Sequence, residues 1–173
     1  MEQTPVECRC MVGKNSKKKK TLVLGVGNTL LADEGAGVHA MRYLECHSES
    51  LAEIEFLDAG TLSFTLAGDI AEADNLIIFD AAQINASPGT IRVFEGDDLD
   101  AFLSSGRRSV HEVGFADLMD IARLQDSLPA NRALIGIQPE VLGWGHSTGE
   151  SVTAAIPRAA DSARALIGKW SQR

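Results

Sequence analysis

Short apolar runs alternate along this chain with segments of helical spacing, and this alternation restricts the fold more than any other feature. The runs 21–27, 75–79 and 132–138 have the length and composition of buried strands. Between them, apolar residues recur at intervals of three and four, as on one face of a helix. Strands that alternate with helices form βαβ units. The sequence therefore predicts a three-layer α/β domain, with a mostly parallel sheet between helices.

Weaker patterns complete the predicted elements. Two further strands are expected at 53–57 and 89–94, and helices are expected at 35–46, 62–70, 115–122 and 152–170. Pro157 lies inside the last of these helical patterns and should either kink that helix or shift its start.

The length of 173 residues suits one domain with one core. We expect a loosely packed N-terminal extension over 1–20, because this segment is polar and ends in the basic run Lys17–Lys20. A single α/β domain should follow over 21–173. The polar segment Ser104–Ser109 should be more mobile than the elements beside it.

Charge and composition limit the classes of molecule that this protein is expected to bind. The net charge of −8 argues against nucleic acid as a general partner, since phosphate binding needs clustered basic groups. No run approaches the ~20 apolar residues that span a bilayer, and the first residues lack a secretory pattern. We therefore expect a cytoplasmic protein that binds neither nucleic acid nor membrane. Three cysteines do not make a disulfide framework.

The turn after the first predicted strand contains Gly25-Val-Gly27, which invites a dinucleotide-binding interpretation. Leu30, however, occupies the place of the third glycine of that motif. Asp33 and Glu34 follow at the predicted start of the helix, where they would repel an anionic ligand. Helix capping is the simpler explanation of these two acids.

Ligands of parallel sheets bind at the carboxyl ends of the strands. Glu34 follows the first strand, Asp80 ends the third, and His111 precedes an amphipathic helix. Each has a plain structural explanation alone, as a capping acid, a turn acid or a helix-flanking residue. Together, two carboxylates and one imidazole suit a borderline divalent ion with open coordination positions. The sequence contains no HExxH or P-loop motif.

The chain resembles the endopeptidases that mature the large subunit of NiFe hydrogenases. The resemblance covers nearly all of the sequence after Thr21. It is carried by six motifs: Leu24–Val38, Asp58–Thr61, Leu76–Ala81, Pro88–Thr90, His111–Gly114 and Ile135–Glu140.

The resemblance implies a twisted sheet of about five strands and cytoplasmic removal of a short C-terminal peptide from a precursor large subunit after nickel insertion. It implies that Glu34, Asp80 and His111 form the catalytic metal site, which reads nickel carried by the substrate; other divalent ions are also expected to fit. Substrate contacts are expected at Asn28, Asp58, Gly60 and Thr61. Ala59 stands where this family often has a second glycine.

Two alternatives stay open at this point. One is an oxidoreductase that binds a dinucleotide, and the other is an assembly factor that checks nickel occupancy without cutting. The sequence names neither the hydrogenase served nor the oligomeric state.

Overall fold

The computed structural model describes residues 19–48, 54–61, 64–104 and 112–172. Its elements, in chain order, are β1 (Thr21–Val26), η1 (Ala32–Gly35), α1 (Ala36–Cys46), β2 (Ile54–Gly60), η2 (Phe64–Leu66), α2 (Ala67–Glu72), β3 (Asn75–Ala81), β4 (Ile91–Glu95), α3 (Asp97–Ser104), α4 (Glu112–Leu124), β5 (Asn131–Ile137) and α5 (Glu150–Ser171).

The sheet has five strands in the order β2-β1-β3-β5-β4. Four strands are parallel, and β4 joins the edge antiparallel to β5. The chain moves outward from β1 to β2 and then returns to the opposite side of β1 for β3. The topological switch point, where such sheets bind ligands, therefore lies between the carboxyl ends of β1 and β3.

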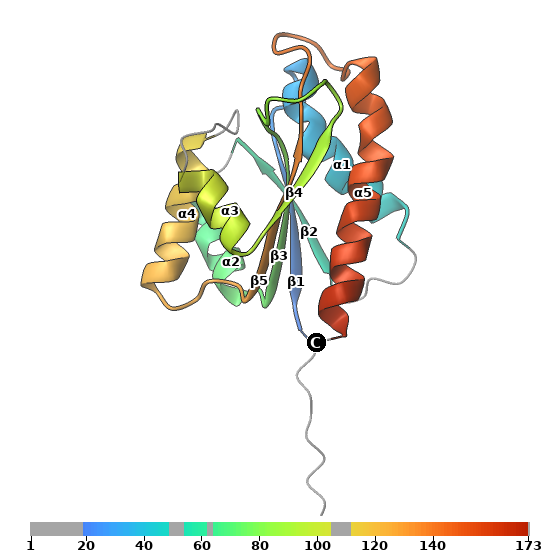
Figure 1. The fold of residues 1–173 in the computed structure, drawn as a ribbon. Helices are drawn as coiled ribbons and strands as arrows, with labels where there is room; N and C mark the ends of the chain where they lie inside the picture. The colour runs from blue at the N-terminus through green and yellow to red at the C-terminus, as the bar shows by residue number, and fades with distance from the viewer. Residues whose placement is uncertain (1–18, 49–53, 62–63, 105–111, 173) are drawn as a thin grey trace, which may run out of the picture.

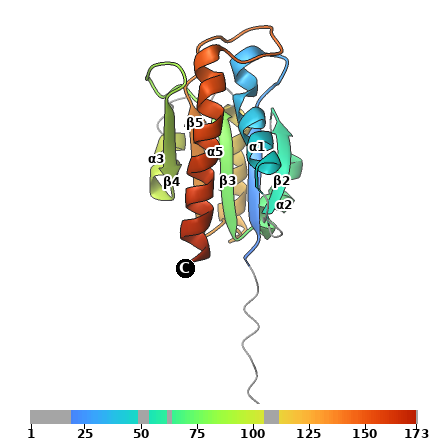
Figure 2. The ribbon, with the colours of Figure 1, turned by 90° about the vertical axis from the view of Figure 1, so that its right-hand side faces the viewer.

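Helices cover both faces of the sheet in three layers, as predicted (Figures 1 and 2). α1 and α5 lie side by side on one face, and α2, α3 and α4 lie on the other. Strand residues alternate between two apolar clusters: Ile77 and Phe79 pack with α1 and α5, whereas Leu76 and Ile78 face the other three helices.

The expected strands and helices are confirmed, with shifted ends. The predicted strand ending at Phe79 continues to Ala81, so Asp80 lies inside β3. Gly89 stands outside β4, which begins at Ile91. The last helix begins at Glu150 and continues through Pro157, so the proline does not set its start.

Helix α3 was not predicted. It is eight residues long and buries only Leu99 and Phe102, which is too short a pattern to stand out in the sequence. Three aspartates in its first turn favour the helix because they face the positive end of its dipole.

Of the predicted extension over 1–20, only Lys19 and Lys20 are described. The segment that was expected to be mobile, Ser104–Ser109, lies outside the described residues except for Ser104, which ends α3. Within the described part of the chain, no helix is both long and apolar enough to cross a membrane.

Candidate functional site

Two glycines allow the turn between β1 and α1, which carries Asp33 and Glu34, to pack directly against the ends of the strands. Gly27 has a φ of +139°, and a Cβ there would overlap the carbonyl oxygen of Glu34. A Cβ on Gly37 would overlap the carbonyl oxygens of both Val26 and Phe79. The start of α1 therefore lies against β1 and β3 at the switch point, and Glu34 is held there with it.

Asp80 comes to the same edge from the neighbouring strand. It is the penultimate residue of β3, pairs with Gly136 of β5 and is only 3% exposed. Because side chains alternate along a strand, Asp80 shares the face of Ile78, which is the face covered by α2, α3 and α4. η1, which carries the half-buried Glu34, contacts β3. Glu34, in the turn that follows β1, and Asp80, near the end of β3, thus both lie at the carboxyl edge of the sheet.

His111, the third predicted ligand, lies outside the described residues. The next residue, Glu112, begins α4, and Phe115 of that helix packs into the cluster on Asp80's side of the sheet. The chain therefore reaches the site's face of the sheet immediately after His111. Among the described residues alone, no group of three or more His, Cys, Asp and Glu side chains is arranged to hold a metal.

Asp33, beside Glu34, has a role that the sequence did not reveal. Its side chain is fully buried, and its two oxygens accept three backbone N–H bonds from the segment after β5. Oδ2 accepts from Glu140 at 2.8 Å and from Val141 at 2.7 Å, and Oδ1 accepts from Gly149 at 2.6 Å. The expected capping role is wrong, since no side chain caps η1 or α1. Asp33 instead fixes the 139–149 loop over the turn that carries Glu34.

Replacing Asp33 with alanine should lower the free energy of unfolding by about 2 kcal/mol, because three N–H groups lose a charged acceptor. The amides of Glu140, Val141 and Gly149 should then exchange hydrogen faster in native-state exchange measurements. Asp33→Asn retains one acceptor oxygen and should lose less. Unchanged exchange at all three amides in Asp33→Ala would show that the carboxylate does not hold the loop.

The turn offers no cradle for a pyrophosphate. Gly27 N–H donates to Gly60 O at 2.7 Å, and Leu30 N–H donates to Asn28 Oδ1 at 3.0 Å. The N–H groups of residues 31–34 also bond to protein oxygens. A dinucleotide would need such donors turned toward its phosphates. The buried Asp33 and the adjacent Glu34 add negative charge to the same turn.

The four predicted substrate contacts lie around this turn and the end of β2. Asn28 caps the turn through Leu30, and Asp58 Oδ2 accepts from Arg42 of α1 at 2.9 Å. Gly60 has a φ of +52° and follows the register shift of β2. The exposed Thr61 comes next. Asn28 thus lies in the turn after β1, and Asp58, Gly60 and Thr61 lie at the carboxyl end of the neighbouring strand β2. Their contact with substrate stays a prediction.

Helix α1 contains one histidine, His39, whose side chain is half-buried. Burial lowers the pKa of its imidazole, and the nearby Arg42 guanidinium lowers this pKa further. The neutral form of His39 is therefore favoured.

The Pro88–Thr90 motif serves the architecture around α5. Gly89 N–H donates to Gln138 O at 2.9 Å, and Gly89 O accepts from Arg158 Nη2 at 2.9 Å. The Gln138 side chain is buried, and its Oε1 accepts from Ile84 N–H at 2.9 Å. These bonds hold the β3–β4 connection between β5 and α5.

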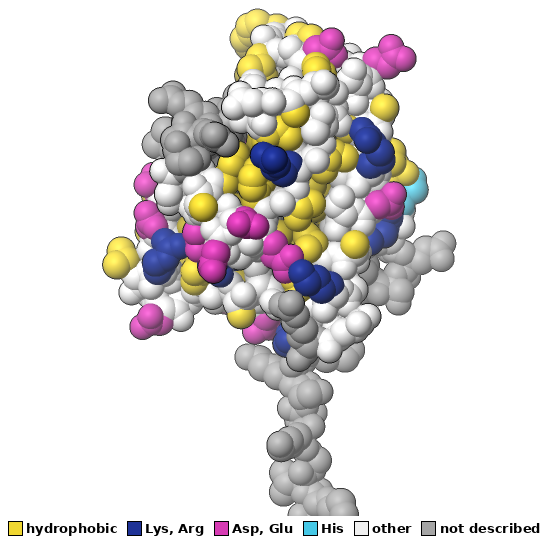
Figure 3. Space-filling model, viewed as in Figure 1, with side chains coloured by type: hydrophobic (Ala, Val, Ile, Leu, Met, Phe, Trp, Pro, Cys, Tyr) yellow, Lys and Arg dark blue, Asp and Glu magenta, His cyan; other side chains and the backbone are white. Residues whose placement is uncertain are grey.

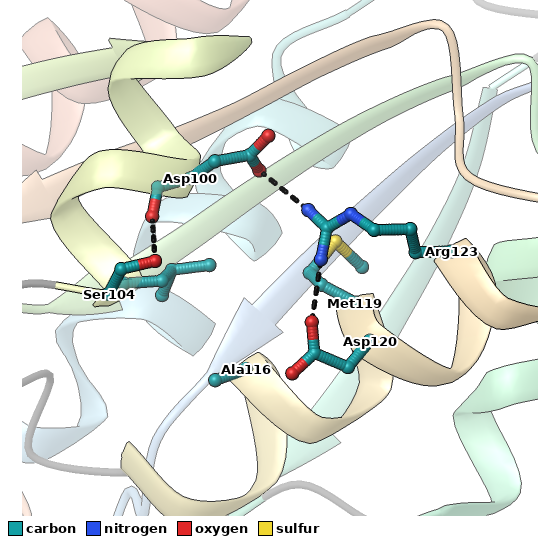
Figure 4. A pocket seen from close by; sticks show the side chains of 7 residues that line it. Asp100, Ser104, Ala116, Met119, Asp120 and Arg123 are labelled. Carbon is teal, nitrogen blue, oxygen red and sulfur yellow. Dashed lines mark hydrogen bonds and ion pairs between the residues drawn. The ribbon is translucent and has the colours of Figure 1, made fainter.

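A cavity of about 200 Å³ opens between α3 and α4 (Figure 4). Its charged groups are already paired: Arg123 lies 2.6 Å from Asp120 and 3.5 Å from Asp100. Asp100 also binds Arg132, near the amino end of β5, through both carboxylate oxygens. These ion pairs connect α3, α4 and β5, and we assign them a structural role.

The fold is an α/β sheet with helices on both faces, and the turn at its switch point carries acidic side chains and no cradle for a nucleotide. The family model described as hydrogenase maturation protease, HycI, matches residues 38–165. The chain belongs to this family and is an endopeptidase of the hydrolase class.

Individual relatives agree with this assignment. The hydrogenase 2 maturation protease of Escherichia coli K12 is 39% identical over 125 residues, which cover 71% of this chain and 75% of the relative. The hydrogenase expression/formation protein HupD of Rhizobium leguminosarum is 35% identical over 152 residues, which cover 87% and 75%. The solved structure of the hydrogenase maturating endopeptidase HybD from E. coli superposes with a TM-score of 0.81 at 34% identity, covering 87% of this chain and 93% of that one.

Proposed function

We propose that this endopeptidase removes the C-terminal extension of a NiFe-hydrogenase large-subunit precursor after nickel has been inserted. Membership of the maturation protease family supports a hydrogenase precursor as the substrate. The nickel dependence follows from the resemblance together with the chemistry of the site. As part of the same proposal we place the reaction in the cytoplasm, where the family resemblance puts the processing of the precursor.

The observation that carries the proposal is the position of Glu34 and Asp80 at the carboxyl edge of the sheet. We include His111 as the third member of the set, and the start of α4 at the next residue, on Asp80's side of the sheet, supports this choice. Two carboxylate groups and one imidazole form an N/O donor set that a borderline divalent ion accepts, with positions left for other ligands. If the nickel is already held by the substrate, the substrate's own groups occupy those remaining coordination positions.

In this proposal, the three side chains bind the nickel of the substrate and thereby place the scissile peptide at the sheet edge. Bound nickel supplies polarisation of a nearby carbonyl or of water. Asn28, Asp58, Gly60 and Thr61 orient the tail that leaves. A precursor without nickel lacks the group that the site binds, so metal occupancy decides which molecules are cut.

The test is mass spectrometry of the purified precursor after incubation with the enzyme, with and without prior nickel loading. The loaded precursor should lose one C-terminal peptide, and the unloaded precursor should keep its full mass. A loaded precursor that binds but keeps its mass would instead identify a checking factor. Equal cleavage of both forms would refute nickel reading. Saturable NADH binding in a parallel titration would support the oxidoreductase alternative.

A further inference from the structure

Four large apolar side chains are exposed together at the carboxyl edge of the sheet. Leu30 is 48% exposed, Val141 and Leu142 are each 51% exposed, and Trp144 is 89% exposed. We call these four residues the edge patch. Figure 3 shows hydrophobic side chains gathered at the top of the molecule, over the loop that joins β5 to α5. Single exposed apolar residues are ordinary, but a contiguous group marks an interaction site.

The edge patch is built on a fixed framework. Gly145 N–H donates to Leu30 O at 3.1 Å, and Ala32 N–H donates to Gly145 O at 2.7 Å. The three bonds to the buried carboxylate of Asp33 hold the two ends of the same loop. An exposed tryptophan on an ordered loop loses little conformational freedom when it binds, which is typical of residues that dominate interfaces.

The same bonds join the edge patch to the candidate site. Leu30 and Glu34 belong to one turn, and residues 139–149 cover that turn from above. Any large partner whose peptide reaches Glu34 and Asp80 must therefore pass beside the patch. Four side chains are too few for a stable interface of about 800 Å² on each partner, so the partner must also cover the neighbouring site.

The charges beside the edge patch are negative. Glu140 and Glu150 are exposed at the two ends of the loop, and the segment 139–149 contains no Lys or Arg. Figure 3 shows acidic side chains next to the hydrophobic group at the top. A symmetric pair of copies joined through this patch would bring these acids close to one another, which disfavours a second copy as the occupant.

We propose that the edge patch docks the folded body of the precursor, through an apolar surface bordered by basic side chains. This inference rests on the proposed function, because it takes the precursor as the partner. The edge patch is separate from the metal-binding groups. Its contact with the folded body increases the enzyme's affinity for the precursor beyond the affinity for the C-terminal tail alone. It gives the enzyme a second means of recognising its substrate, besides the nickel.

The test compares Trp144→Ser with Leu124→Ser in steady-state cleavage of nickel-loaded precursor. Leu124 ends α4 and is 86% exposed, so it is a matched control away from the edge patch. We expect KM to rise about tenfold or more in Trp144→Ser and to change less than about twofold in Leu124→Ser. Both variants should keep the wild-type melting temperature, since both side chains are exposed.

An unchanged KM in Trp144→Ser would overturn the docking proposal. The proposal would also be overturned if sedimentation showed that the wild-type enzyme is a dimer and that Trp144→Ser dissociates it, because the patch would then join two copies of the enzyme. If the wild-type enzyme does not cut the loaded precursor, the proposed function fails, and direct binding of labelled enzyme decides the patch separately. A complex that Trp144→Ser weakens and Leu124→Ser does not would then support docking without cleavage, and equal affinities would overturn it.

Discussion

Glu34→Gln, Asp80→Asn and His111→Ala should each slow release of the C-terminal peptide more than about a hundredfold, because each removes one of three groups proposed to bind the substrate's nickel. The two amide substitutions nearly preserve side-chain volume and remove only the charge, so packing effects should be small. The measurement is single-turnover cleavage of nickel-loaded precursor, followed by mass spectrometry.

His47→Ala provides the control for this series. His47 is an exposed histidine just beyond the end of α1, where its ring stacks on Tyr43. Its loss should leave the cleavage rate within about twofold, as expected for a surface substitution. A His111→Ala enzyme with a native circular dichroism spectrum and a near wild-type rate would refute the metal-reading site, while the fold and family would stand.

Gly37→Ala should lower the free energy of unfolding by at least about 3 kcal/mol, since the added methyl group overlaps two backbone carbonyl oxygens that cannot move independently. Relief requires α1 to move away from β1 and β3, and this also displaces Glu34. Cleavage activity should therefore fall even at temperatures where the variant stays folded. Urea denaturation gives the stability, and the precursor assay gives the activity.

Gly168→Ala is the matched control, because Gly168 lies in α5 and a Cβ there meets no atom within 4 Å. Alanine at this exposed helical position should stabilise the protein by about 0.5–1 kcal/mol, through its better helix propensity. Equal stability of Gly37→Ala and the wild type would mean that α1 is not held tightly against the strand ends.

Much of the architecture can be predicted from the composition of short sequence segments. Thr21–Gly27 and Asn75–Phe79 are apolar enough to identify central strands, and parallel pairing places both carboxyl ends at one edge. From that geometry the sequence predicts that Glu34 and Asp80 lie at the same edge of the sheet. An acidic residue after an apolar strand can be recognised from the neighbouring sequence alone, without knowledge of contacts to distant residues.

Other features depend on partners far along the chain and could not be predicted. Asp33 resembles a capping residue in its local sequence, yet its bonds reach Glu140 and Gly149. The 139–149 loop is rich in glycine, and nothing in its sequence shows that Leu30 lies beside it. The short helix α3 depends on its packing against the sheet for most of its stability.

The distance along the chain between Asp33 and its partners has a consequence for biosynthesis. These bonds span 107, 108 and 116 residues. Contacts between such remote residues carry a large cost in loop-closure entropy and slow folding. During synthesis on the ribosome, the acidic turn therefore stays unanchored until the segment beyond Gly149 has emerged. The turn that carries Glu34 therefore cannot be anchored through Asp33 before residues 140–149 have been synthesised.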